Sequence, residues 1–272
     1  MTRRANDAVE ARLEWAIQIA EQAGALTLQY FRRTDLAVER KADDSPVTIA
    51  DRQAEELLRR LIAERFPDDS ILGEELGATD GSSGFQWVLD PIDGTKSFIH
   101  GVPLYTTLVA VLEGDEPRIG VINAPACGEL AFASTGGGCW YVADAAPTKG
   151  PQPARVSQID RLSEGLLLTS EVASFATGRV SDASDVYQRL ERSARLARTW
   201  GDGYGYLMVA TGRAEVMIDP VMNLWDTAAL EPIIREAGGH FVDWQGEETI
   251  YSGDAIATNG RVTEEVLRIT KT

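Results

Sequence analysis

The first third of the chain carries apolar residues at helical spacing. Apolar positions recur every three or four residues between residues 6 and 31, which predicts an amphipathic helix there. A polar loop is expected at residues 41–46. Thr48 then begins a second predicted helix that ends near Arg65, just before Pro67. The apolar face of this second helix consists of Leu57, Leu58, Leu61 and Ile62.

Short apolar runs in the middle of the chain predict strands. Residues 70–73 (SILG) and 85–89 (FQWVL) have the length and composition of short buried strands. Between residues 105 and 132 the apolar runs are broken by glycines and prolines, which predicts an antiparallel meander. Residues 139–142 are expected to add another strand. The centre of the chain is therefore predicted to form one largely antiparallel sheet.

A change in composition follows this sheet. Residues 143–160 (ADAAPTKGPQPARVSQID) are rich in alanine, proline and small polar residues and form the best candidate for a subdomain boundary. The elements predicted beyond it are strands at residues 166–170 and 215–219 and helices at residues 182–195 and 225–237. The predicted order is two helices, then an antiparallel sheet, then a second half in which strands and helices alternate. This order indicates a layered α+β sandwich within the broad α/β class. We expect residues 1–272 to form one such unit.

Composition is that of a globular protein, but the charge is strongly negative. The 272 residues are 44% hydrophobic and 25% charged, and the formal net charge is −16. A field of this sign repels nucleic acid and anionic membrane surfaces, so we expect neither as a partner. It would also repel a phosphorylated substrate, unless cations lie where the phosphate binds. The simpler explanation of the excess negative charge is that it keeps the protein soluble.

Three further features bear on the compartment. No apolar run is long enough to span a membrane, and the N-terminus lacks the pattern of a signal peptide. Cys127 and Cys139 are too few for a disulfide framework. The expected location is therefore a reducing cytoplasm.

The segment DPIDGT concentrates the candidate chemistry. A predicted buried strand ends at Leu89 and brings Asp90 to its carboxyl end, and Asp93 follows three residues later. Two carboxylates this close repel each other unless a cation lies between them, and hard oxygen ligands suit Mg2+. The Ile92 carbonyl can turn inward as a further ligand, and Gly94 can let backbone amides approach a phosphate oxygen. The alternative is an ordinary Asx-type turn after a strand.

Acids at three other places fit the same site, although each has a simpler explanation. Glu74 and Glu75 follow the strand at residues 70–73, where acids are often solvated turn residues. Asp226 lies near the start of an apolar helix, where aspartate is a preferred N-cap. Asp51 follows Thr48 at capping-box spacing.

Taken together, these segments resemble one protein family. GEE, then DPIDGT about sixteen residues later, then WD before an alanine-rich helix ending in AGG, is similar to the inositol monophosphatase family over about residues 10–260. The resemblance implies a phosphatase that cleaves a small phosphate monoester with a metal-activated water. It also implies two or three Mg2+ ions per active site and a homodimer. The metal ligands that it implies are Glu74, Asp90, Asp93, Asp226 and the Ile92 carbonyl.

The resemblance also assigns the reacting groups. Asp51 and Thr95 correspond to the residues that orient the attacking water, with Glu74 beside them in the catalytic set. The substrate would be contacted by Asp93, Gly94, Thr95 and Asp226. Lys41 corresponds to a basic residue that the family often keeps near the phosphate.

The substrate is suggested by departures from the commonest family pattern. DPIDGT is followed by Lys96-Ser97-Phe98 instead of Thr-Asn-Phe, and Asp202 lies between two glycines within residues 197–219. Both stretches look like the histidinol-phosphate phosphatase branch of the family. Asp202 and Asp219 are then candidates to pair with a cationic substrate, and Arg198 is a further substrate-binding candidate. Asp202 can equally be read as a turn residue.

Other functions stay open at this point. Within the phosphatases they are a broadly specific inositol monophosphatase and a 3′-phosphoadenosine-type bisphosphate nucleotidase. A haloacid-dehalogenase phosphatase is disfavoured because Asp90 and Asp93 are separated by two residues and not by one. The non-enzymatic alternative is an inactive metal-binding relative.

Overall fold

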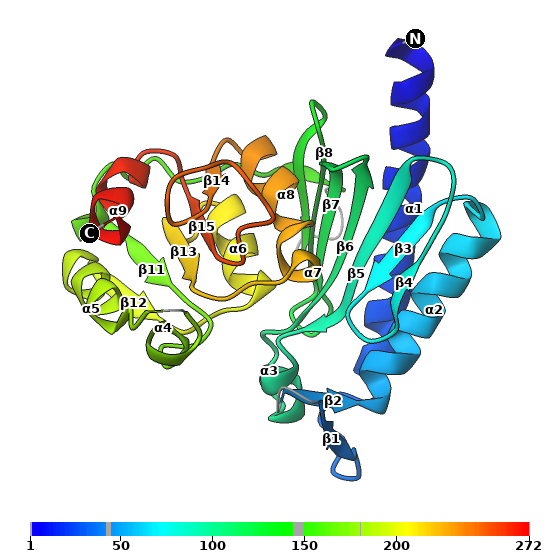
Figure 1. Cartoon of the computed structure of the whole chain (residues 1–272), viewed down its shortest axis with the longest axis horizontal. Coiled ribbons are helices and arrows are strands. Elements are labelled where there is room, and N and C mark those ends of the chain that lie inside the picture. The colour runs from blue at the N-terminus through cyan, green and yellow to red at the C-terminus, as the bar shows by residue number, and fades with distance from the viewer. Residues whose placement is uncertain (1, 42–44, 144–149, 180, 272) are drawn as a thin grey trace.

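The computed structural model describes residues 2–41, 45–143, 150–179 and 181–271. Residues 42–44 of the predicted polar loop and 144–149 of the predicted boundary therefore lie outside the described residues. Helices and two β-sheets alternate in layers across the molecule (Figure 1). This arrangement confirms the predicted layered sandwich.

Three layers of helices cover or separate the sheets, as Figure 1 shows. The outer face of the larger sheet is covered by α1 (Thr2–Leu28) and α2 (Ile49–Arg65). Between the sheets lie α6 (Gly203–Ala210) and α8 (Leu230–Glu236). The outer face of the smaller sheet is covered by α5 (Ser184–Ser193) and α9 (Thr263–Thr270).

The larger sheet has eight strands in the order β10-β9-β8-β7-β6-β5-β3-β4. Its strands are β3 (Ser70–Gly73), β4 (Gly77–Thr79), β5 (Phe85–Asp93), β6 (Thr106–Glu113), β7 (Glu116–Ala124), β8 (Glu129–Ser134), β9 (Gly138–Ala143) and β10 (Gln152–Pro153). All neighbours are antiparallel except β3 and β5, which are parallel. The predicted meander is confirmed, and β10 shows that part of the candidate boundary segment pairs with this sheet.

The smaller sheet has five strands in the order β12-β11-β13-β15-β14. Its strands are β11 (Leu166–Leu168), β12 (Leu196–Arg198), β13 (Val216–Asp219), β14 (His240–Val242) and β15 (Ala255–Thr258). β11 is parallel to both β12 and β13, whereas β15 is antiparallel to β13 and β14. The remaining short elements are the hairpin β1 (Val38–Arg40) and β2 (Pro46–Thr48), the helices α3 (Thr95–Ile99), α4 (Ser174–Thr177) and α7 (Leu224–Thr227), and a 3-10 turn at Leu162–Glu164.

The predicted helix boundaries need two corrections. The first helix was expected to run to residue 31, but α1 ends at Leu28, and the chain then makes tight turns in which Gln29 and Tyr30 donate three residues back. The helix expected at residues 225–237 is divided into α7 and α8. Pro232 has no amide hydrogen and its ring crowds the preceding turn, so it is tolerated in the first turn of α8 but not within one continuous helix from residue 225. Gly238, at φ +90°, ends α8 as expected.

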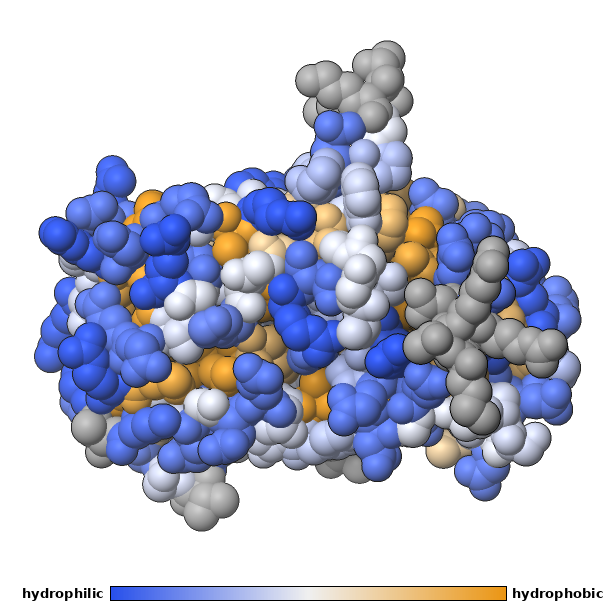
Figure 2. Space-filling model, turned by 90° about the horizontal axis from the view of Figure 1, so that it is seen from above, coloured by the Kyte–Doolittle hydropathy of each residue, from blue (hydrophilic) through white to orange (hydrophobic). Residues whose placement is uncertain are grey.

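The surface agrees with the composition. Figure 2 shows hydrophilic residues over most of one face, with hydrophobic residues visible between them. No helix among the described residues is long and apolar enough to cross a membrane.

Candidate active site

Parallel pairing of β3 and β5 brings two acids to one edge of the larger sheet. Gly73 pairs with Leu89 in this ladder, so Glu74 and Asp90 emerge side by side where the strands reach the edge. β5 continues to Asp93, four residues beyond the predicted end, but its pairing with β6 is irregular between Asp90 and Asp93. In a regular strand, side chains three positions apart point to opposite faces. The irregularity allows the two aspartates to converge.

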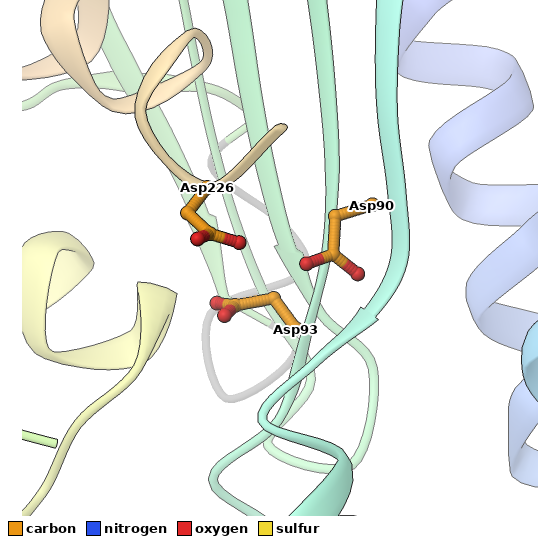
Figure 3. Close-up of side chains that lie close together, drawn as sticks. All are labelled: Asp90, Asp93 and Asp226. Atoms are coloured by element: carbon orange, nitrogen blue, oxygen red, sulfur yellow. The ribbon is translucent and has the colours of Figure 1, made fainter. Parts of the chain in front are cut away.

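Three carboxylates meet at this edge. Ligand atoms of Asp90, Asp93 and Asp226 all lie within 4.8 Å of one another. Figure 3 shows their carboxylates pointing toward one another, Asp226 from α7 and the other two from β5. A residue 133 positions further along the chain thus completes a cluster begun by DPIDGT.

The electrostatics of this cluster fit a divalent cation. Burial raises the pKa of Asp90 well above its usual range, and the charges of Glu74, Asp93 and Asp226 raise it further. Burial and the charges of Asp202 and Asp226 raise the pKa of Asp93 in the same way. Burial also raises the pKa of Asp226 to about 7. The ionised forms of these neighbouring carboxylates repel one another, and a cation between them would stabilise the ionised forms. Carboxylate oxygens are also the hard ligands that Mg2+ prefers.

Local structure fixes the orientation of Asp226. It was a candidate N-cap, but Asn223 caps α7 and Asp226 is the third residue of that helix. The Asn223 amide donates to Asp226 Oδ2 at 2.6 Å, which completes a capping box. The capping box therefore engages Oδ2 of Asp226.

The two carboxylate oxygens of Asp51 make different contacts. Its Oδ2 accepts from the Thr48 amide at 2.7 Å and from the Thr48 hydroxyl at 2.6 Å, so the expected capping box of α2 is present. Its Oδ1 lies 3.4 Å from the Thr95 hydroxyl, which also donates to the Ile92 carbonyl at 3.0 Å. Burial raises the pKa of Asp51. The capping explanation and the catalytic one are thus compatible, because each uses a different oxygen.

Gly94 joins β5 to α3 in a conformation that requires glycine. Its φ is +87°, in the left-handed region, and it occupies the N-cap position of α3. A Cβ atom added there would lie 2.7 Å from Asp202 Oδ2. The backbone therefore passes close to Asp202 as Thr95 begins α3.

Lys41 lies next to the expected metal ligands. Its Nζ atom is 2.6 Å from Glu74 Oε1 and 2.6 Å from Glu75 Oε1. Burial by itself lowers the pKa of Lys41, but the hydrogen bonds to the two glutamates outweigh burial and hold the pKa above its usual value. Burial raises the pKa of Glu75 to about 7. Lys41 thus supplies one positive charge at an otherwise acidic edge.

A pocket of about 380 Å³ opens beside the carboxylates. It extends from Glu74, Asp93, Thr95 and Asp226 into the second half of the chain, where it is lined by Ser170, Glu171, Asp202, Tyr206 and Asp219. Lys96 and Glu171 form an ion pair of 2.7 Å between residues that both line it. Away from the expected metal ligands, the pocket therefore combines acidic and polar residues with the apolar side chains of Val221, Met222 and Leu230.

Of the three candidates for substrate binding within residues 197–219, two are among the described residues that line the pocket and one is not. Asp219 is buried and accepts hydrogen bonds from Thr169, Ser170 and Tyr206 at 2.9–3.3 Å. Asp202 is half-buried, and burial raises its pKa. The exposed guanidinium of Arg198 donates to the Ala197 carbonyl, and Arg198 is not among the described residues that line the pocket. Two of the three candidates are therefore brought together.

The turn suggested for Asp202 is instead the start of a helix. Asp202 occupies the N-cap position of α6, an element that the glycine-rich sequence did not predict. The Gly203 amide donates to Asp93 Oδ2 at 2.5 Å, and the Thr106 hydroxyl donates to the same atom at 2.9 Å. A Cβ atom at Gly203 would lie 2.6 Å from that oxygen. Gly203 thus supports Asp93 through its backbone, a role with no side-chain signal in the sequence.

Comparison with known proteins identifies the family. The model of the inositol monophosphatase family matches residues 8–271. A histidinol-phosphatase from Chlorobaculum parvum is 43% identical over 90% of this chain and 91% of its own length, and one from Mycobacterium tuberculosis is 36% identical over 93% and 95%. The solved structure of the IMPase from Thermotoga maritima superposes with a TM-score of 0.84 at 31% identity, covering 96% of this chain and 97% of its own.

These similarities span both sheets and every acid described above. The family match includes the segments that carry Asp51, Glu74, Asp90, Asp93 and Asp226. The chain belongs to the inositol monophosphatase family and is a metal-dependent phosphoric monoester hydrolase.

Proposed function

We propose that this enzyme hydrolyses histidinol phosphate to histidinol and inorganic phosphate, a step of histidine biosynthesis. The observation that carries the proposal is the wall of the pocket beyond the carboxylate cluster, which is lined by Glu171, Asp202 and Asp219 and on which Lys96 is paired with Glu171. Histidinol carries an amine and an imidazole, so its cationic end suits such a wall. The similarity to histidinol-phosphatases points in the same direction.

In this proposal the metal ligands are Glu74, Asp90, Asp93, Asp226 and the Ile92 carbonyl. They would hold two or three Mg2+ ions, which would lower the pKa of a bound water and neutralise charge on the phosphate and on the departing oxygen. Lys41, now paired with Glu74 and Glu75, would add a further positive charge near the phosphate. The excess of negative charge on the protein therefore need not exclude a phosphorylated substrate.

Thr95 and Asp51 would manage the proton of the attacking water. The Thr95 hydroxyl is held by the Ile92 carbonyl and lies within reach of Asp51 Oδ1. A water that donates to Thr95 Oγ1 could pass a proton through that hydroxyl to Asp51. The water oxygen would then form the new bond to phosphorus as the ester P–O bond breaks. The departing alkoxide would take a proton from a neighbouring water and leave as histidinol, while Asp51 returns its proton to solvent.

Gly94 and Thr95 would contact the phosphate through their backbone. The left-handed turn at Gly94 starts α3, and first-turn amides of a helix have no partner within the helix. Such amides are suited to phosphate oxygens. The phosphate would then lie between this turn and the carboxylate cluster, with its ester oxygen directed toward Asp202 and Asp219.

A side-by-side measurement of kcat/KM tests the proposal. Histidinol phosphate, inositol 1-phosphate and a 3′,5′-bisphosphate nucleotide would be compared at saturating Mg2+. We expect histidinol phosphate to be preferred by at least about tenfold, which corresponds to one charge-assisted contact. Preference for inositol 1-phosphate would support the broadly specific alternative, and preference for the nucleotide would support the nucleotidase. No hydrolysis of any ester would support an inactive relative.

A further inference from the structure

A fully buried carboxylate lies directly behind the turn that carries Glu74. Glu55 is on α2, one helical turn after Asp51, and its exposed fraction is 0%. A buried carboxylate is costly unless hydrogen bonds and an opposite charge compensate it. The partners of Glu55 therefore indicate what the side chain does.

Both oxygens of Glu55 accept hydrogen bonds from the backbone after Glu74. Oε2 accepts from the Glu75 amide at 2.7 Å, and Oε1 accepts from the Leu76 amide at 3.1 Å. The balancing charge comes from Arg59, whose Nε donates to Oε1 at 2.7 Å. One side chain of α2 thus binds two consecutive amides of the turn between β3 and β4.

The peptide groups on either side of Glu74 are consequently both fixed. The Glu74 amide donates to the Leu89 carbonyl, which precedes Asp90 on β5, at 3.2 Å. The next amide, that of Glu75, is bound to Glu55. Before the turn, Gly73 packs so closely that an added Cβ atom would lie 2.0 Å from Glu55 Oε1. Glu74 is therefore tied to β5 on one side and to α2 on the other.

We propose that Glu55 is a positioning residue that holds Glu74 in the geometry required for metal binding. The inference rests on the proposed function, in which Glu74 is a metal ligand. α2 then serves the site twice, through Asp51 for the attacking water and through Glu55 for the metal. Glu55 itself contacts neither metal nor substrate, because its two oxygens are directed to the turn.

Substitution of Glu55 by glutamine tests this role with a direct binding measurement. Glutamine keeps one acceptor and the side-chain shape, but it presents an amide donor to one of the two turn amides. We expect Mn2+ binding, followed by electron paramagnetic resonance, to weaken about tenfold or more. The apparent KM for Mg2+ should rise by a similar factor, whereas kcat at saturating Mg2+ and KM for the phosphate ester should change little.

Glu215→Gln is the matched control. Glu215 is also buried, at 4% exposure, and its carboxylate also accepts from a backbone amide, that of Leu166 at 2.6 Å. It lies elsewhere in the fold, directly before β13 of the smaller sheet. This variant should lose stability without a change in Mn2+ affinity. An equal weakening of Mn2+ binding in both variants would overturn the proposal, because it would reveal a general effect on folding.

A second pair of variants keeps the test informative if Glu55→Gln folds poorly. Gly73→Ala places a methyl group against the Glu55 carboxylate, and Gly73→Ala/Glu55→Ala removes that clash. The double variant should regain thermal stability relative to Gly73→Ala and yet bind Mn2+ weakly. Recovery of Mn2+ affinity together with stability would refute the positioning role. A wild-type enzyme that bound no Mn2+ would instead contradict the proposed metal site.

Discussion

The Thr95 hydroxyl lies 3.4 Å from Asp51 Oδ1, although 44 positions separate the two residues in the chain. The contact joins the start of α3 to the first turn of α2. It exists because the other oxygen of Asp51 is fixed by Thr48, which leaves Oδ1 directed at the site.

Replacing Thr95 by valine should disable this pair without affecting the cap of α2. Valine keeps the branched shape but removes the hydroxyl, so kcat should fall about 100- to 10,000-fold, the usual contribution of a positioned proton carrier. Mn2+ affinity should change little, because Thr95 is not itself a proposed metal ligand and only donates a hydrogen bond to one, the Ile92 carbonyl. Thr95→Ser is the control and should keep most of the activity. Loss of Mn2+ binding in Thr95→Val would show that the hydroxyl supports the metal site.

Asp90→Asn should abolish turnover while the fold is kept. The substitution removes a proposed ligand, and it also relieves repulsion among buried carboxylates in the metal-free protein. Without Mg2+ the variant should therefore unfold at a Tm roughly 2–4 °C above that of the wild type, for about 1 kcal/mol of relieved repulsion. Circular dichroism and steady-state kinetics check both parts. A kcat above about a tenth of the wild-type value would contradict the assignment.

Asp202→Asn should impair histidinol phosphate selectively. The carboxylate makes no capping hydrogen bond to α6, so asparagine is expected to be tolerated by the fold. Loss of one charge-assisted contact should reduce kcat/KM for histidinol phosphate by about ten- to a hundred-fold. Hydrolysis of glycerol phosphate, whose leaving group carries no charge, should change little. Equal losses on the two esters would show that Asp202 supports the site in general and would favour the inositol monophosphatase alternative.

Glu231→Gln should stabilise the enzyme only at higher pH. Burial raises the pKa of Glu231 in α8 to about 7, and its Oε2 atom has no hydrogen-bond partner among the residues that the structure describes. Since the folded state holds this proton more tightly than the unfolded chain, the free energy of unfolding falls as pH rises from about 4.5 to about 7. The loss amounts to at most about 3 kcal/mol. Tm measured at pH 5 and pH 8 should show a gain for the variant at pH 8 alone, and an equal gain at both would contradict the ionisation account.

The acids proposed as metal ligands on the two neighbouring strands could be located in the sequence because their signals are local. The apolar runs that end at Gly73 and Leu89 mark strand ends, and the acids follow directly. The N-terminal cap of α2 at Thr48 is likewise determined by a few adjacent residues. Parallel pairing between the two strands, which the expected antiparallel sheet did not include, then places these ends together.

The features that the sequence analysis did not predict depend mostly on tertiary contacts. α6 is buried along nearly its whole length, so it has no polar face to mark its period, and its glycines suggest a turn. Glu55 has the sequence signature of a solvated helical acid, and only the turn packed against it shows otherwise. The break between α7 and α8 could have been found from Pro232, which the apolar pattern obscured.

The ends of both sheets limit how this protein can associate with itself. The larger sheet is bounded by the two-residue β10, which contains Pro153, and by the three-residue β4, which starts with glycine. The smaller sheet is bounded by β12 and β14, each three residues long. Edges this short, one of them lacking a donor at proline, offer little template for a strand from another molecule. Assembly of two copies through either of these two sheets should therefore rely on contacts between side chains and not on extension of the sheet across the interface.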